Sequence, residues 1–296
     1  MKDKNAPARA MELLNEMKSR RLEVDSTTYA YIINIFTKAR SPKSAEIATK
    51  FLDEVEETSK VGSFPSPLFY SAVLQAYAKN SRLAQLEQLL QRFKGAYKEG
   101  KIYAKPTLLC YNAVIDGLAR AGRAARAEEL LTELEIGHAA GDNTLRPTVR
   151  SYNAAILAWK SSNSTEAPQR AESLLKRMYE SGCQPDQVTF NTIIGLYANC
   201  RAVGAAERAE SFLKVLEDMY YNVGEERLKP DIISYNSVIN AWTNSGSHDA
   251  GERARQVFDR MKARYEAGDD QLKPNFATLS SLAKAIEKSK VSAATS

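Results

Sequence analysis

Apolar residues recur along this chain at helical spacing, in a pattern that returns roughly every 40 residues. One such face is formed by Tyr235, Val238, Ile239 and Trp242, at positions i, i+3, i+4 and i+7. A second helical pattern follows each face and is marked by segments such as Ala-Glu-Glu-Leu-Leu at residues 127–131. A period of this length is typical of a stacked array, so the pattern predicts an all-α chain of helix pairs.

A heptad begins the first helix of each pair, and it reads Pro-Asp-Ile-Ile-Ser-Tyr-Asn at residues 230–236. Proline cannot continue a helix and the residue after it is a good N-cap, so the heptad marks each helix start. Close copies begin at Pro106, Pro147 and Pro185, looser ones at Pro65 and Pro274, and one without proline covers residues 25–30. If each repeat ends at the residue that follows the proline, the sequence predicts a single array. It comprises a partial repeat 1–25, full repeats 26–66, 67–107, 108–148, 149–186, 187–231 and 232–275, and a partial repeat 276–296.

The spacing within the repeats varies. From the alanine of the second helix to the next proline there are 14 residues in repeat 149–186, but 20 or 21 in four others. From the heptad aromatic to that alanine there are 16 residues in repeats 26–66 and 108–148, but 19 in the last three full repeats. We interpret the differences as longer second helices or loops and longer turns, which leave the stacking face in register.

The composition excludes several classes of protein. The 296 residues are 44% hydrophobic, enough for a substantial core. Three scattered cysteines argue against disulfides or a structural zinc and favour a reducing compartment. The longest uncharged stretch, residues 61–78, contains two prolines and many polar residues, so no membrane span is expected. No secretory or transit signal is visible at Met1, where the chain starts inside a helical pattern, so we expect that the true N-terminus is missing.

Catalytic chemistry has little support in the sequence. Only two histidines occur, His138 and His248, and neither has metal-ligand spacing. A His-x-Glu motif with Cys-x-x-Cys, as zinc deaminases carry, is absent, as is an acidic cluster suited to a metal-dependent nuclease. We therefore expect no catalytic residue, no metal site and no cofactor.

The excess positive charge lies on the first helices. Their opening thirteen residues hold seven basic and two acidic side chains over all repeats, and this surplus equals the chain's net charge of +5. The remaining sequence is balanced. A basic layer opposite a neutral one is the electrostatic pattern expected for binding a polyanion.

The repeat resembles that of the pentatricopeptide repeat family in three features. These are the heptad, the Ala-Gly and Ser-Gly at residues 121–122 and 245–246, and an alanine followed seven residues later by methionine in the second helix. The resemblance covers essentially the whole chain and is closest over residues 106–275. The tetratricopeptide pattern Trp-x2-Leu-Gly-x2-Tyr is absent. The resemblance implies a right-handed α-solenoid superhelix in which each repeat contacts one nucleotide of single-stranded RNA on the first-helix side.

In that family the residue after the heptad aromatic reads the base together with the last residue of the repeat. The resemblance implies two uracil readers, Asn153 with Asp186 and Asn191 with Asp231, and a cytosine, or less strictly pyrimidine, reader, Asn236 with Asn275. It also implies a weaker pyrimidine reader, Asn112 with Thr148, a purine reader, Ser71 with Thr107, and a degenerate repeat, Ala30 with Ser66. Read from 5′ to 3′ along the RNA, the expected central part of the recognised sequence is pyrimidine-U-U-C.

The resemblance also implies contacts to base faces and to phosphates. Residues two before the heptad aromatic are expected to pack on base faces, and these are Leu68, Leu109, Arg150, Val188 and Ile233. Arg150 replaces the usual aliphatic residue and could instead stack on a base or pair with phosphate. Cations eight residues after the reader are expected near phosphates, and these are Lys38, Lys79, Arg120 and Lys288. The three closest-matching repeats carry Ser161, Asn199 and Asn244 there.

Simpler explanations exist for some of these residues. The last residue of each repeat is a good N-cap, which alone could account for Ser66, Thr107, Thr148, Asp186, Asp231 and Asn275. The recurring asparagines lie inside helices, where Asn is a poor helix former, and base reading or an inter-repeat hydrogen bond would explain them. The aromatics six residues after the reader, Tyr77, Trp159, Tyr197 and Trp242, are expected in the core.

The sequence thus predicts a non-enzymatic protein that binds single-stranded RNA. The resemblance implies action in mitochondria or chloroplasts, in stabilising, processing, editing or translating organellar transcripts, with organellar RNA-processing proteins as possible partners. The alternative is a scaffold that uses the same superhelix to hold a peptide or partner helix.

Overall fold

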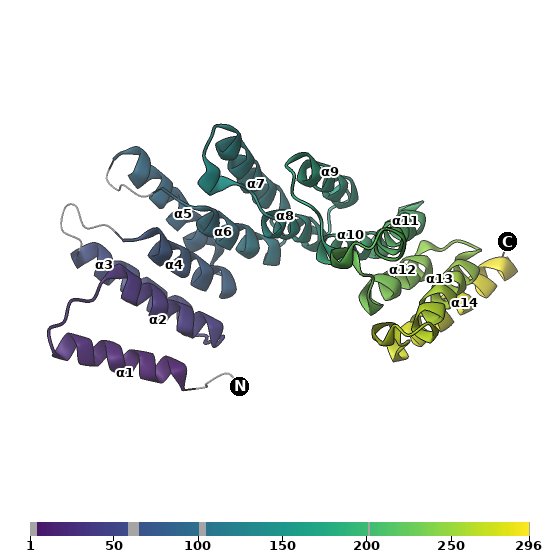
Figure 1. Ribbon diagram of the computed structural model, residues 1–296, viewed down its shortest axis with the longest axis horizontal. Helices are drawn as coiled ribbons and strands as arrows, with labels where there is room; N and C mark the ends of the chain where they lie inside the picture. Colours follow the sequence, from purple (N-terminus) through teal and green to yellow (C-terminus); the bar gives the residue numbers. More distant parts are fainter. Residues whose placement is uncertain (1–4, 59–64, 101–104, 201, 296) are drawn as a thin grey trace. The chain divides into compact units, whose positions relative to one another are not determined.

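The computed structural model describes residues 5–58, 65–100, 105–200 and 202–295. These residues form fourteen α-helices joined by turns, short 3-10 helices and one π-helical turn, with no strand among them. The chain divides into two compact units, unit 1 (residues 1–161) and unit 2 (residues 162–296), which are described separately. Figure 1 shows the helices coloured along the chain. The all-α prediction is confirmed.

Unit 1 contains the first helices of four repeats, here called A helices, and the second helices that alternate with them, called B helices. The A helices are α2 (Ser26–Lys38), α4 (Pro67–Lys79), α6 (Leu108–Arg120) and α8 (Val149–Ser162). The B helices are α1 (Ala6–Ser19), α3 (Ser44–Thr58), α5 (Leu83–Lys98) and α7 (Ala124–Ala139). α2 packs on α4 and α4 on α6, and α3 and α5 each contact the A helices before and after them in sequence.

Unit 2 repeats this arrangement. Its A helices are α10 (Gln187–Asn199), α12 (Ile232–Ser245) and α14 (Phe276–Thr295), and its B helices are α9 (Ala167–Glu180), α11 (Ala205–Glu217) and α13 (Ala250–Glu266). α10 packs on α12 and α12 on α14, while α11 and α13 lie against the A helices before and after them. Within each unit the helix pairs therefore stack as an α-solenoid, as the periodicity predicts.

A side chain at the second position of the heptad caps five of the A helices, α2, α4, α10, α12 and α14. At α12 the Ser234 amide donates to Asp231 Oδ1 at 2.9 Å, and the Asp231 amide donates back to Ser234 Oγ at 3.1 Å. Asp186 and Thr189 form the same reciprocal capping box at α10. Such a cap stabilises a helix by about 1 kcal/mol. Thr107 differs, because its side chain makes no cap hydrogen bond to α6, so the capping explanation is wrong for this residue.

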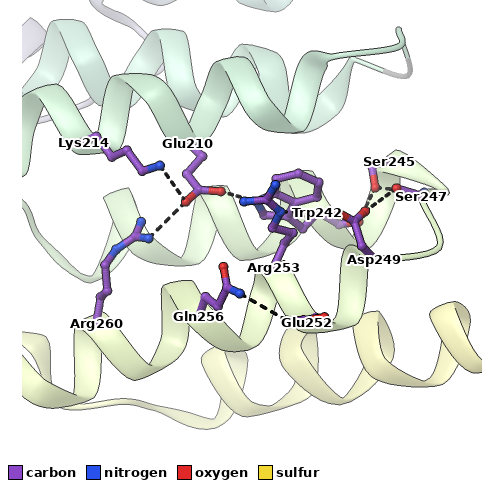
Figure 2. Close-up of polar contacts among 10 residues, drawn as sticks. All are labelled: Glu210, Lys214, Trp242, Ser245, Ser247, Asp249, Glu252, Arg253, Gln256 and Arg260. Carbon is purple, nitrogen blue, oxygen red and sulfur yellow. Dashed lines mark hydrogen bonds and ion pairs between the residues drawn. The ribbon is translucent and has the colours of Figure 1, made fainter.

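The aromatics six residues after each proposed reader lie in the core and are tied to the preceding B helix. Trp242 is 1% exposed, and its Nε1 donates to Glu210 on α11 at 3.0 Å. Figure 2 shows that Glu210 also meets Arg260 at 3.0 Å and Lys214 at 3.5 Å, so its buried charge is compensated. Trp159 likewise donates to Glu128, and Tyr197 to Glu172. The prediction that these aromatics lie in the core is confirmed, and glutamates of the preceding B helices accept hydrogen bonds from three of them.

In repeats 108–148, 187–231 and 232–275 the extra residues form an extended B helix and a 3-10 turn before the next proline. These turns are Asn143–Leu145, Glu226–Leu228 and Asp270–Leu272, and the last two end on leucines that are 3% and 0% exposed. In repeat 187–231 a π-helical turn, Asp218–Asn222, continues α11. From the second-helix alanine to the next proline this repeat has 21 residues, one more than repeats 108–148 and 232–275. The turn accommodates this residue, because a π turn holds one more residue than an α turn.

None of the described helices combines the length and hydropathy needed to cross a bilayer. Within the described part of the chain, no three His, Cys, Asp or Glu side chains gather where they could hold a metal ion.

Candidate nucleic-acid interface

Asn191 on α10 and Asp231 at the start of α12, a reader pair implied by the family resemblance, lie in hydrogen-bond contact. Asn191 Nδ2 donates to Asp231 Oδ1 at 3.1 Å. The hydroxyl of Ser234, the capping-box residue of α12, lies 2.6 Å from Asn191 Oδ1. These contacts join consecutive A helices, so the cap and the proposed reader form one network.

This network leaves specific groups available to a ligand. Ser234 Oγ accepts the Asp231 amide and has a single proton, which it can give to Asn191 Oδ1. With its oxygen held in this way, Asn191 presents only its amide donors. Asp231 uses Oδ1 for all its side-chain contacts, and Oδ2 has no hydrogen bond within the described residues. The pair therefore offers a donor beside a carboxylate acceptor.

Asn236 and Asn275 are linked through a third residue. Thr278 Oγ1 donates to Asn236 Oδ1 at 2.8 Å and lies 3.0 Å from Asn275 Oδ1. Asn275 Oδ1 also accepts the Thr278 amide at 3.0 Å and so caps α14. Both asparagine oxygens are thereby occupied, and both amide NH2 groups remain as donors.

Asn112 repeats the motif in unit 1. Ser151 Oγ donates to Asn112 Oδ1 at 2.8 Å and lies 3.2 Å from Thr148 Oγ1. Asn112 is only 5% exposed. Asn153 is half-buried on α8 in unit 1, whereas Asp186 caps α10 in unit 2. Their pairing as a reader stays a prediction.

The two earlier repeats lack this arrangement. The position of Ser151 and Ser234 is taken by Cys110 in one repeat and by Phe69 in another. Ser71 is 1% exposed and donates to the Leu68 carbonyl at 2.8 Å within its own helix, so it is not bridged to Thr107. Burial raises the pKa of the Cys110 thiol, which keeps this group neutral. Ala30 is fully buried.

The positions proposed to pack on base faces carry exposed apolar side chains. Leu109 is 53% exposed, Val188 56% and Ile233 58%, although most other apolar residues of their helices are buried. Leu68 is half-buried. Arg150, at the same position of α8, forms an ion pair with Asp116 on α6 and keeps 65% of its side chain exposed.

The proposed phosphate residues have a structural partner that the sequence does not reveal. Three of the four donate to a carbonyl at the end of the preceding A helix: Lys79 to Thr37 at 3.2 Å, Arg120 to Ala78 at 3.4 Å and Lys288 to Thr243 at 3.1 Å. Asn244 donates in the same way to Ala198 at 3.0 Å. A cation at this end also complements the helix dipole. Lys38 is exposed.

The hydroxyls of Ser151, Ser234 and Thr278 are functional candidates that sequence reasoning left without a role. Each bridges a reader asparagine to the next helix start. The signal was present in the sequence, because the heptad that follows each of Asn112, Asn153, Asn191 and Asn236 carries Ser or Thr at its fifth position.

Comparison with known proteins gives a consistent result. A family model described as "PPR repeat" matches residues 104–135, and one described as "Pentatricopeptide repeat domain" matches residues 160–200 and 214–288. Together these segments cover half of the chain. A search of curated proteins found no match.

Two solved structures resemble the chain in fold. One is the pentatricopeptide repeat protein PPR10 in complex with an 18-nt psaJ RNA element, at 19% identity and a TM-score of 0.51. A cysteine-substituted form of PPR10 with the same RNA element gives the same identity and TM-score. Each alignment covers 97% of this chain and 43% of PPR10, so the chain spans less than half the length of these proteins.

Proposed function

Because the chain belongs to the pentatricopeptide repeat family, we propose that it binds single-stranded RNA, one base per repeat, along the surface of its A helices. The observation that carries the proposal is the recurring asparagine whose oxygen is held by a hydroxyl of the next A helix, together with the partial exposure of Asn191 and Asn236. PPR10, which shares the fold, was crystallised with RNA. Asparagine, exposed apolar and basic positions recur once per repeat, which suits a polymer ligand.

The repeat containing Asn191 suits uracil. The Watson–Crick edge of uracil carries an N–H donor between two carbonyl acceptors. Asn191 Nδ2 can donate to a carbonyl, and Asp231 Oδ2 can accept the N–H. Cytosine has no N–H at that ring position and would leave the carboxylate unsatisfied. A well-formed pair of such contacts discriminates between bases by about 1–3 kcal/mol.

The repeat containing Asn236 suits cytosine. The ring nitrogen and carbonyl of cytosine are adjacent acceptors, and the free NH2 groups of Asn236 and Asn275 are two donors. Asn112 with Thr148 adds a weaker pyrimidine preference, and Asn153 with Asp186 a second uracil. The proposed site is therefore pyrimidine-U-U-C, preceded by the purine preference of Ser71 with Thr107.

Base faces and phosphates complete the proposed site. Val188 and Ile233 would pack between successive bases, and Arg150 would stack through its guanidinium plane. Lys79, Arg120 and Lys288 stay exposed beside the helix ends and would attract the backbone.

We further propose an organellar role without catalysis. RNA covered by a solenoid is shielded from nucleases and kept from folding on itself, which is a sufficient mechanism for stabilising, processing or promoting translation of a transcript. Mitochondria or chloroplasts are the proposed location, and organellar RNA-processing proteins the proposed partners.

Fluorescence anisotropy with labelled RNA tests the binding function. We expect a strand containing pyrimidine-U-U-C to bind more tightly than an adenine homopolymer, with affinity falling as salt rises. Equal binding to all homopolymers, or none, would contradict the proposal and favour a scaffold for protein partners.

A further inference from the structure

A basic pocket lies at one edge of unit 1, where α2 and α4 end. Its volume is about 410 Å³, and its lining includes the cations Arg40, Lys79 and Arg120 together with the polar side chains of Ser41, Ser44 and Asn80. The lining contains no carboxylate. Three cations without an acidic neighbour in the walls form a site for an anion.

Hydrogen bonds hold the walls of this pocket in place. Lys79 and Arg120 are anchored to carbonyls of the preceding A helices, and Asn80 Nδ2 donates to both Ser44 Oγ and the Ala76 carbonyl at 2.8 Å. Ser44 also begins α3, so the amide-rich end of this helix lies at the pocket. The cations are thus held in position without an anion.

Arg40 follows the end of α2 with a φ of 56°, in the left-handed region. The corresponding residue after α6 is Gly122, with a φ of 66°. Glycine adopts this conformation without cost, whereas arginine does not. Arg21 has the same conformation after α1, with a φ of 55°, but does not line the pocket.

The charge of the pocket and its position relative to the base-reading repeats indicate its ligand. A phosphodiester carries one negative charge, whereas a terminal phosphate carries about 1.5 to 2 negative charges near pH 7. A terminal phosphate therefore matches three cations better. Ala30 cannot hydrogen-bond a base, so base reading starts with the next repeat. An RNA bound 5′ to 3′ along the chain therefore has the 5′ end of its read segment beside this pocket.

We propose that the pocket of Arg40, Lys79 and Arg120 binds the 5′-terminal phosphate of the RNA, so that the protein recognises a phosphorylated 5′ end as well as a base sequence. This inference rests on the proposed RNA-binding function. The shared chemistry is a phosphate group, and an internal phosphodiester is the alternative source that the experiment distinguishes.

The test compares three RNAs that share a purine-pyrimidine-U-U-C sequence and carry an internal label. One has a 5′-phosphate, one a 5′-hydroxyl, and one a 5′-hydroxyl with a 3′-phosphate. We expect the first to bind about tenfold more tightly than the other two, because three cations form charge-assisted hydrogen bonds with it. The Arg40→Gly variant keeps the backbone conformation that glycine prefers and should lose most of this difference while retaining its affinity for 5′-hydroxyl RNA. Arg21→Gly is the matched control and should behave like wild type.

The outcomes separate the inference from the proposed function. Equal affinity of wild type for the three RNAs would overturn the inference and leave sequence-selective binding intact. An equal loss for all three RNAs in Arg40→Gly would assign the pocket to an internal phosphodiester and also overturn it. Failure of wild type to bind any of the RNAs would overturn the proposed function itself.

Discussion

The Ser234 hydroxyl supports both the fold and the proposed reading of uracil. The substitution Ser234→Ala removes this hydroxyl alone and so measures its contribution to each. The hydroxyl lies 2.6 Å from Asn191 Oδ1 and accepts the Asp231 amide at 3.1 Å. Ser234 is fully buried, so water cannot replace these bonds. A hydrogen bond contributes about 1 kcal/mol, and a buried group left unsatisfied costs about 1–3 kcal/mol. We expect the free energy of unfolding to fall by about 2 kcal/mol, because the two contacts are lost while the Asp231 cap on the Ser234 amide remains.

Urea denaturation followed by circular dichroism measures this change, with Ser237→Ala on the same helix as the control. Ser237 has no side-chain hydrogen bond in the described structure, and alanine is the better helix former, so stability should stay level or rise slightly. In RNA binding, Ser234→Ala frees the Asn191 amide to turn over, so the preference for uracil at this repeat should weaken. Unchanged stability and an unchanged uracil preference would together refute the bridging role of the hydroxyl.

Three further predictions address packing, base contact and pH. Gly251→Ala should lower the free energy of unfolding by about 1–3 kcal/mol in the same assay, because the added Cβ would lie 3.0 Å from Ile286 Cα on α14; an unaltered urea midpoint would contradict this close approach. Ile233→Ser should weaken RNA binding several-fold in anisotropy titrations and leave the melting temperature unchanged, because the side chain is 58% exposed; a lower melting temperature with normal binding would assign it to the core. Hydrogen bonding from Arg208 lowers the pKa of Glu172, so this pair should stabilise the fold above the ordinary glutamate pKa of about 4.3 and lose its effect as pH falls. Glu172→Gln should therefore lower the melting temperature at pH 7 more than at pH 3, and an equal shift at both would argue against the linkage.

The helix pairs, their order and their buried faces could be predicted from sequence, because they depend on local periodicity and on caps close in the chain. Asp231 caps a residue three positions away, and the chemistry of that contact is visible in the heptad itself. The reader pair Asn191 and Asp231 followed from the family resemblance, and the structure places the two side chains in contact. The base specificity derived from them remains a proposal.

Contacts between repeats were harder to predict. The bond from Arg120 to the Ala78 carbonyl depends on how closely two A helices approach, which no local pattern encodes. The π turn at Asp218–Asn222 arises from one extra residue, and sequence spacing cannot distinguish a bulged helix from a longer loop. Thr107 illustrates the opposite error, since a residue well suited to capping makes no cap bond.

The most direct test of RNA reading is the base preference of the single repeat that contains Asn191. Four RNAs that differ only at the base facing this repeat are titrated against wild type and against Asn191→Ser, with Ser237→Ala on the neighbouring helix α12 as the control variant. Wild type should bind the uracil strand more tightly than the others by about 1–3 kcal/mol, and Asn191→Ser should shift the preference towards guanine. The same base preference in both proteins would show that Asn191 only forms hydrogen bonds between repeats. The account of base reading would then be wrong.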